Sequence, residues 1–224
     1  MGKIGNGYGS EWHMLRYLGR YRNILNQEIT RLVGGLTIDW LDFPDNGEWK
    51  GLDFLSNEFE ALRHQWKAEW PQSGNVMNWD AVGWLKGTQA TELVLVEAKS
   101  HIGELKSTCG AAEHGGLPQI RNFLARAKSK FGAPSSADWL SPHYQYCNRL
   151  AMLEFLRANA LPARLVLVYF TGDTFTKMQC PKNEAAWREA LSELKNQIGL
   201  PVHSQLEAVH ELFLSTKVLR RPLE

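Results

Sequence analysis

The sequence has little cysteine, almost no net charge and no long apolar run. Its three cysteines, Cys109, Cys147 and Cys180, are odd in number and widely spaced, so they show neither a disulfide framework nor paired metal ligands. Lysine and arginine number 25 against 24 aspartates and glutamates, and the net charge of +1 gives no overall attraction to nucleic acid. Any binding of nucleic acid must therefore use a local patch.

Signals for export, membrane insertion and zinc binding are also missing. No apolar run approaches the roughly 18 residues of a membrane span, and the N-terminus lacks the basic and apolar stretches of a secretory signal. The seven histidines do not cluster, and the G-x-G-x-G string at 5–9 has no strand before it, as a dinucleotide site requires. We therefore expect a cytoplasmic protein without membrane association.

What is present indicates one globular domain of 224 residues, because hydrophobic residues make up 44% of the chain and charged residues 22%. Nine tryptophans are many for this length. They indicate an aromatic-rich core, or, as the alternative, a surface on which bases or sugars stack.

Apolar residues at helical spacing predict five helices. Their approximate ranges are 10–33, 55–66, 118–131, 142–158 and 183–198. Gly34 and Gly199 are the expected stops of the first and last helix.

Compact apolar runs predict strands at Trp79–Leu85, Leu93–Val96 and Arg164–Phe170, and the first two form an antiparallel hairpin. Residues 206–214 fit a strand or a helix equally well. We predict an α/β or α+β fold with three layers, in which helices cover both faces of a mixed central sheet. The core covers about residues 10–172, and a helical extension follows at about 173–224.

The residues whose side chains could carry out chemistry lie at the end of the second strand of the hairpin. Glu97 and Lys99 follow its apolar run, and residues two apart in a strand point to the same face. If Leu85 faces Glu92, then Asp80 faces Glu97, with Cβ atoms about 5 Å apart. A slip of one residue would turn Asp80 to the other face.

Two carboxylates this close repel each other, and one takes up a proton unless a cation lies between them. Mg²⁺ suits this position because it prefers carboxylate and carbonyl oxygens and keeps several waters. Lys99 can hold a phosphate oxygen or the attacking water. This set of groups suits metal-assisted hydrolysis of a phosphodiester.

Asp80 in NWDAVGWL, followed by Glu97-Ala98-Lys99 in LVLVEAKSH, resembles the motif of the PD-(D/E)XK nuclease superfamily. The resemblance covers about residues 10–172 and includes a similar order of helix, hairpin, helix and strand. Trp79 stands where the family has proline, and the insert at 102–118 is long. The resemblance implies a restriction-endonuclease-like fold and a Mg²⁺- or Mn²⁺-dependent nuclease acting on DNA or RNA.

The resemblance also implies further site residues. A glutamate on the family's first helix often joins the metal site, and Glu11 matches it best, with Glu58 as the competitor. A polar residue on the helix after E-x-K often faces the site, and Gln119 stands there. The implied catalytic residues are Asp80, Glu97, Lys99 and Gln119, and the implied metal-binding residues are Asp80, Glu97, Glu11 and Ala98.

A polar stripe on the predicted helix 142–158 is a candidate surface for nucleic acid. Gln145, Asn148 and Arg149 share one helix face, and amide and guanidinium groups bind phosphates and sugars. Arg121 and the other basic residues of 121–130 add a second candidate patch. The alternative is that both surfaces are ordinary solvated helix faces.

Two other hypotheses remain open from the sequence. A nuclease-like domain that binds nucleic acid or a protein partner without cutting is favoured by the near-zero net charge. In an unrelated α/β domain, Glu97 and Lys99 would form a surface salt bridge. The expected partner is nucleic acid, with DNA favoured, and a homodimer is one option for assembly.

Overall fold

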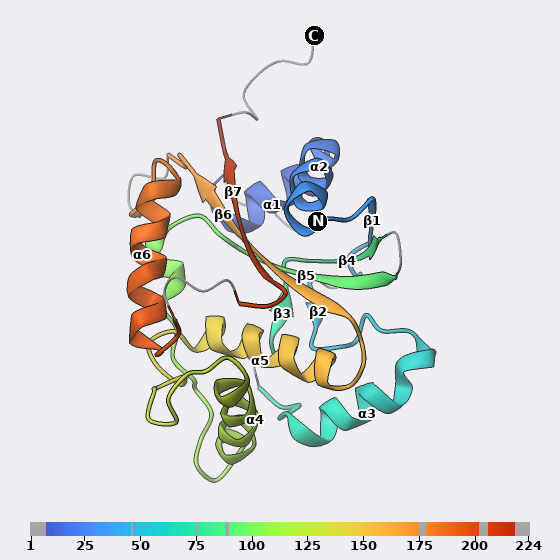
Figure 1. Ribbon diagram of the computed structural model, residues 1–224, viewed down its shortest axis with the longest axis vertical. Helices are drawn as coiled ribbons and strands as arrows, with labels where there is room; N and C mark the ends of the chain where they lie inside the picture. Colours follow the sequence, from blue (N-terminus) through green and yellow to red (C-terminus); the bar gives the residue numbers. More distant parts are fainter. Residues whose placement is uncertain are drawn as a thin grey trace.

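A computed structural model describes residues 8–45, 47–74, 76–87, 90–174, 178–201 and 206–217. Within these residues, six α-helices surround a five-stranded sheet with the order β1-β4-β5-β6-β7 (Figure 1). The strands are β1 (Thr37–Trp40), β4 (Ala81–Lys86), β5 (Thr91–Lys99), β6 (Ala163–Thr171) and β7 (Val209–Ser215). Strand β4 pairs antiparallel with both β1 and β5, while β6 pairs parallel with both β5 and β7, which confirms the predicted mixed sheet and the α+β class.

Helices α1 (Ser10–Leu18) and α2 (Arg22–Val33) cover one face of the sheet. Even-numbered residues of β5 and β6, such as Val96 and Val168, pack there against Leu25 and Ile29. The sequence predicts one helix over 10–33, but the chain breaks after Leu18 at Gly19, because glycine inside a helix costs about 1 kcal/mol. Gly34 ends α2 in the left-handed conformation, as predicted.

The opposite face is covered by α3 (Glu60–Glu69), α4 (Leu117–Lys130), α5 (Tyr144–Ala158) and α6 (Glu184–Gln197). Odd-numbered residues of β5 and β6, such as Leu95 and Leu167, face this layer. Trp66, Trp79, Trp139 and Trp187 are fully buried, which confirms the aromatic-rich core. The last three of them donate their indole N–H to backbone carbonyls, so their polar atoms are satisfied.

The β4–β5 hairpin has the register on which the site prediction depends. Leu85 pairs with Glu92, and Ala81 pairs with Val96. Asp80 lies one position before Ala81, and its backbone N–H donates to the Val96 carbonyl at 3.1 Å. Continuing the ladder by one position therefore brings Asp80 opposite the next residue of β5, which is the glutamate of the E-x-K motif.

A second, two-stranded ladder lies beside this end of the sheet. Strand β2 (Trp49–Lys50) pairs with β3 (Asn78–Trp79), and Trp49 is the partner of Trp79. This pairing brings the residue before β2, Glu48, to the same end of the fold as Asp80 after β3.

The segment after residue 172 supplies α6 and also β7, an edge strand parallel to β6. The open choice at 206–214 is thus decided in favour of a strand from Val209, and the extension is only partly helical. No helix in the described ranges has both the length and the apolar character required to cross a membrane.

Candidate active site

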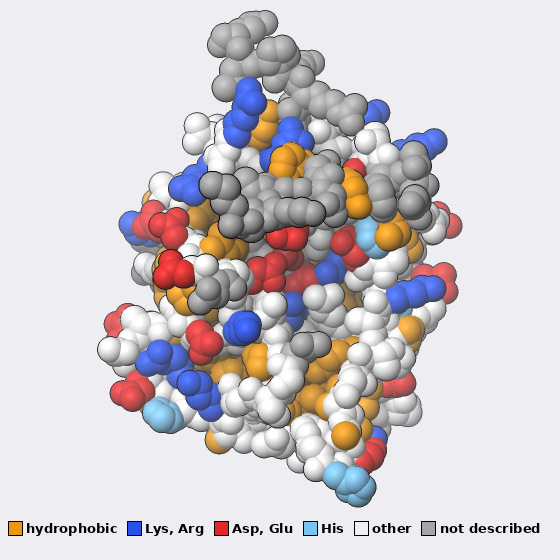
Figure 2. Space-filling view, turned by 180° about the vertical axis from the view of Figure 1, so that it is seen from behind, with side chains coloured by type: hydrophobic (Ala, Val, Ile, Leu, Met, Phe, Trp, Pro, Cys, Tyr) orange, Lys and Arg blue, Asp and Glu red, His pale blue; other side chains and the backbone are white. Residues whose placement is uncertain are grey.

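Four carboxylates from separate segments line one cleft of about 460 Å³ at the end of β5. They are Glu11 on α1, Glu48 before β2, Asp80 after β3 and Glu97 on β5, and we call this site the acidic cleft. The cleft is also lined by Ala98, Lys99, Gln145, Asn148 and Arg149, five residues that are also candidates from the sequence. Figure 2 shows acidic side chains gathered near the centre of this face of the molecule, with basic side chains beside them.

Glu97 is buried between two cations. Its Oε2 accepts a hydrogen bond from Arg149 Nε at 2.7 Å, and its Oε1 is paired with Lys99 Nζ. Burial alone would raise the pKa of Glu97, but the charges of Arg149 and Lys99 outweigh it and lower the pKa. Glu97 is therefore held as a carboxylate at neutral pH.

Arg149 is held on all sides by protein groups and is 2% exposed. Its NH1 group donates to Asn148 Oδ1 at 3.0 Å, its NH2 group donates to the Asn78 carbonyl at 2.6 Å, and its guanidinium lies 4.7 Å from the Trp79 ring centre. Because these contacts occupy its guanidinium, Arg149 acts as a positioning residue for Glu97. The alternative of a solvated helix face is wrong for Arg149 and Asn148, since both are buried.

Asp80 is in a different electrostatic state from Glu97. Its Oδ2 accepts the backbone N–H of Ala98 at 2.7 Å. Burial and then the charge of Glu97 raise its pKa well above the ordinary value, although Lys99 and the Ala98 N–H oppose this shift. The repulsion between the two neighbouring carboxylates thus contributes to a raised pKa at Asp80, whereas the pKa of Glu97 stays lowered.

Glu48 was not predicted from the sequence. Burial raises its pKa, a hydrogen bond from Asn78 opposes the shift, and the charges of Glu97 and Glu11 add to it. The only sequence signal was a carboxylate directly after the Asp45-Asn46-Gly47 turn, which does not indicate a site without the β2–β3 pairing.

The start of α1 is tied to the end of β5, which explains how Glu11 reaches the cleft. Ser10 Oγ donates to Glu104 Oε1 at 2.9 Å, while Glu104 Oε2 accepts the backbone N–H groups of Ser100 and His101 at 2.6 and 3.1 Å. Glu58, the competing candidate, is exposed, accepts from the Ser56 hydroxyl and does not line the cleft.

Gln119 and Arg121 lie outside the acidic cleft. Gln119 is exposed and donates to the Ala68 carbonyl at 3.3 Å, and Arg121 forms an exposed pair with Glu113 at 2.6 Å. The helix that reaches the cleft after E-x-K is α5, which packs on β6, whereas α4 packs on the outside of α5. Gln145 on α5 lines the acidic cleft, whereas Gln119 does not.

The acidic cleft supplies carboxylate oxygens, which are the type of ligand atom that a hard divalent cation binds. Mg²⁺ and Mn²⁺ prefer oxygen ligands, and Mg²⁺ is commonly held by one or two carboxylates with several waters. Asp80 and Glu97 supply two carboxylates, and a cation would offset both the burial and the repulsion from Glu97 that raise the pKa of Asp80. In the described ranges, no three His, Cys, Asp or Glu side chains are close enough to hold a metal on their own.

Comparison of the chain with protein-family models, with curated proteins and with solved structures finds no match. Any functional conclusion must therefore come from the residues of the acidic cleft.

Proposed function

We propose that this protein is a Mg²⁺- or Mn²⁺-dependent nuclease of the PD-(D/E)XK type that hydrolyses phosphodiester bonds of DNA or RNA. The observation that carries this proposal is the meeting of Asp80, Glu97 and Lys99 in one cleft. The order of helix, antiparallel strands, E-x-K strand, helix and parallel strand supports a restriction-endonuclease-like core.

In the proposed reaction, a water oxygen attacks phosphorus and gives up a proton to solvent, the bond from phosphorus to the leaving oxygen breaks, and the leaving oxygen takes up a proton from solvent. Asp80 and Glu97 would hold the metal ion, which lowers the pKa of a bound water and polarises the phosphate when present. The Lys99 ammonium would stabilise negative charge on a phosphate oxygen. For this, Lys99 would exchange its pairing with Glu97 for one with the substrate.

Residues of α5 would support these groups. Arg149 keeps Glu97 ionised and fixes its orientation through the 2.7 Å hydrogen bond. Gln145 lines the acidic cleft and also a small cavity of about 20 Å³ beside Lys99 and Glu97. We assign to Gln145 the polar contact that the resemblance assigns to the helix after E-x-K.

A second candidate function is a nuclease-like domain that binds nucleic acid or a protein partner without cutting. Both oxygens of Glu97 are already paired with cations, one with Arg149 and one with Lys99. A site whose carboxylate is already paired with cations has less tendency to take up a metal. The net charge of +1 also favours this second candidate.

Cleavage of labelled nucleic acid separates the two candidates. The full chain is incubated with single- and double-stranded DNA and RNA and with Mn²⁺, Mg²⁺ or EDTA. We expect cleavage that requires the metal and falls about 100-fold or more in Lys99→Ala, since removing one charge-stabilising donor has that effect. Lys86→Ala is the matched control, because Lys86 lies on β4 and pairs with exposed Asp39 outside the cleft. Equal cleavage by both variants would refute the proposed role of Lys99, and binding without cleavage would favour the second candidate.

A further inference from the structure

A second cleft of about 510 Å³ lies next to the acidic cleft, and Tyr144 lines both. Its other walls are formed by Trp70, by Ile120 on α4 and by the loop 108–116. We call it the neutral cleft. Figure 2 shows hydrophobic side chains exposed below the acidic centre of this face, toward the end of the molecule that carries α3 and α4.

Among the described residues that line the neutral cleft, none is charged. A path for phosphates needs lysine or arginine side chains, as in proteins that follow a nucleic-acid backbone. Aromatic and aliphatic side chains with a few polar atoms suit an uncharged, flat and partly apolar group instead. Its volume is within the usual range for a site that encloses a small organic group.

The loop 108–116, which forms one wall, is anchored by backbone hydrogen bonds and by a close contact at Gly116. The backbone N–H of Cys109 donates to the Leu140 carbonyl at 2.8 Å, and that of Ser107 donates to the Pro142 carbonyl at 2.6 Å. A Cβ atom on Gly116 would lie 2.4 Å from Pro71 Cγ, so only glycine permits this close approach. The two ends of the loop are therefore anchored to the rest of the fold.

We propose that the neutral cleft binds an unpaired nucleobase of the nucleotide next to the phosphate at Lys99. This inference rests on the proposed nuclease function and names its substrate class. Because Tyr144 lines both clefts, a chain with its phosphate in the acidic cleft can place the adjoining base directly in the neutral one. A base within a duplex is stacked and paired, so it cannot enter without being extruded. The substrate is thus single-stranded nucleic acid or an unpaired end.

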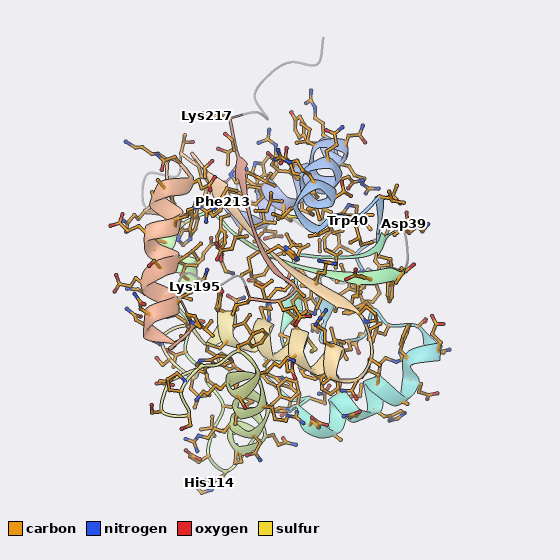
Figure 3. The ribbon with its side chains drawn as sticks, in the orientation of Figure 1. Asp39, Trp40, His114, Lys195, Phe213 and Lys217 are labelled. Carbon is orange, nitrogen blue, oxygen red and sulfur yellow. The ribbon has the colours of Figure 1, made fainter. Side chains whose placement is uncertain are left out.

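Equilibrium binding in EDTA tests this inference without hydrolysis of the ligand. The probes are fluorescent single-stranded and blunt duplex oligonucleotides of the same sequence. Ala112→Trp fills the cleft from an exposed wall position, and His114→Trp is the control, because His114 projects from the same loop at the end of the molecule and does not line the cleft (Figure 3). We expect Ala112→Trp to weaken single-strand binding about tenfold, comparable to the loss of one base stack, and His114→Trp to leave it unchanged.

Three readouts keep this inference distinguishable from the nuclease proposal. Equal single-strand binding by the wild type and by Ala112→Trp overturns the inference, provided that Thr108→Trp, a second variant in the cleft wall, also binds normally. Wild-type cleavage of duplex as fast as of single strands likewise overturns it and leaves the nuclease proposal standing. Single-strand binding that Ala112→Trp abolishes, with no cleavage in any metal, supports the base site and refutes the nuclease.

Discussion

Arg149 Nε lies 2.7 Å from Glu97 Oε2 and joins helix α5 to the end of strand β5 across 52 positions of sequence. Both side chains are almost fully buried, with relative exposures of 2% and 5%. A buried ion pair costs desolvation free energy that the attraction only partly offsets, and removal of one partner leaves the other charge buried without compensation.

Replacing Arg149 should therefore be costly. We expect Arg149→Ala to lower the free energy of unfolding by about 3–5 kcal/mol, because it leaves the Glu97 carboxylate buried without its main partner. Urea denaturation at neutral pH measures this change. The control is Arg121→Ala, which removes an exposed pair with Glu113 and should cost at most about 1 kcal/mol. A cost as small for Arg149 as for Arg121 would mean that the pair with Glu97 does not form in solution.

Stability should depend on pH with opposite signs at the two carboxylates. The raised pKa of Asp80 favours the folded state below the unfolded pKa, and this contribution is lost as pH rises through the folded pKa. In EDTA, Asp80→Asn should thus become more stable than the wild type as pH rises.

The lowered pKa of Glu97 stabilises the folded state above the unfolded pKa, and this contribution is lost as pH falls through the folded pKa. Glu97→Gln should therefore be less stable than the wild type at neutral pH. Urea denaturation over a pH series is the measurement, and parallel curves for Asp80→Asn and the wild type would contradict the shift at Asp80.

Divalent cations should stabilise the protein through Asp80. At a Mn²⁺ concentration of 100 times Kd, linkage contributes about 2.7 kcal/mol, which raises Tm by roughly 5–10 °C for a chain of this size. Asp80→Ala should abolish the rise in thermal unfolding experiments. Asp39→Ala should keep it, because Asp39 is an exposed carboxylate on edge strand β1 (Figure 3). A full rise in Asp80→Ala would place the metal elsewhere.

Cleavage should respond to Gln145 and not to Gln119. Gln145 lines the acidic cleft, so Gln145→Ala should lower the cleavage rate about tenfold, the effect of losing one hydrogen bond to a charged group. Gln119→Ala should cleave at the wild-type rate, because Gln119 is exposed and contacts Ala68. The reverse order of effects would return the role to α4.

The register of the β4–β5 hairpin could be predicted from the sequence because its causes are local. A buried apolar run, a short loop and the alternation of strand side chains leave few ways to pair Leu85 with Glu92. From that pairing the neighbourhood of Asp80 and Glu97 follows directly. The convergence of Asp80, Glu97 and Lys99 thus needed no knowledge of the helices.

The break at Gly19 and the places of Gln119 and Glu48 could not be predicted in the same way. Helical spacing shows which residues can share a face, but it does not show which helix lies against the sheet. Both α4 and α5 have apolar faces, and only their mutual packing makes α5 the helix that contacts β6. Glu48 reaches the cleft through the pairing of β2 with β3, a ladder of two residues on each strand with almost no pattern of its own.

The sequence by itself determined the β4–β5 hairpin, strand β6 and the side on which Asp80, Glu97 and Lys99 lie, because these depend on neighbours along the chain and across one tight hairpin. The tertiary structure decided that Arg149 neutralises Glu97, that Gln145 lines the cleft in place of Gln119, and that Tyr144 joins two clefts. Those relationships arise when distant apolar faces are buried together, and the free energy of that burial depends on the whole core rather than on any local segment.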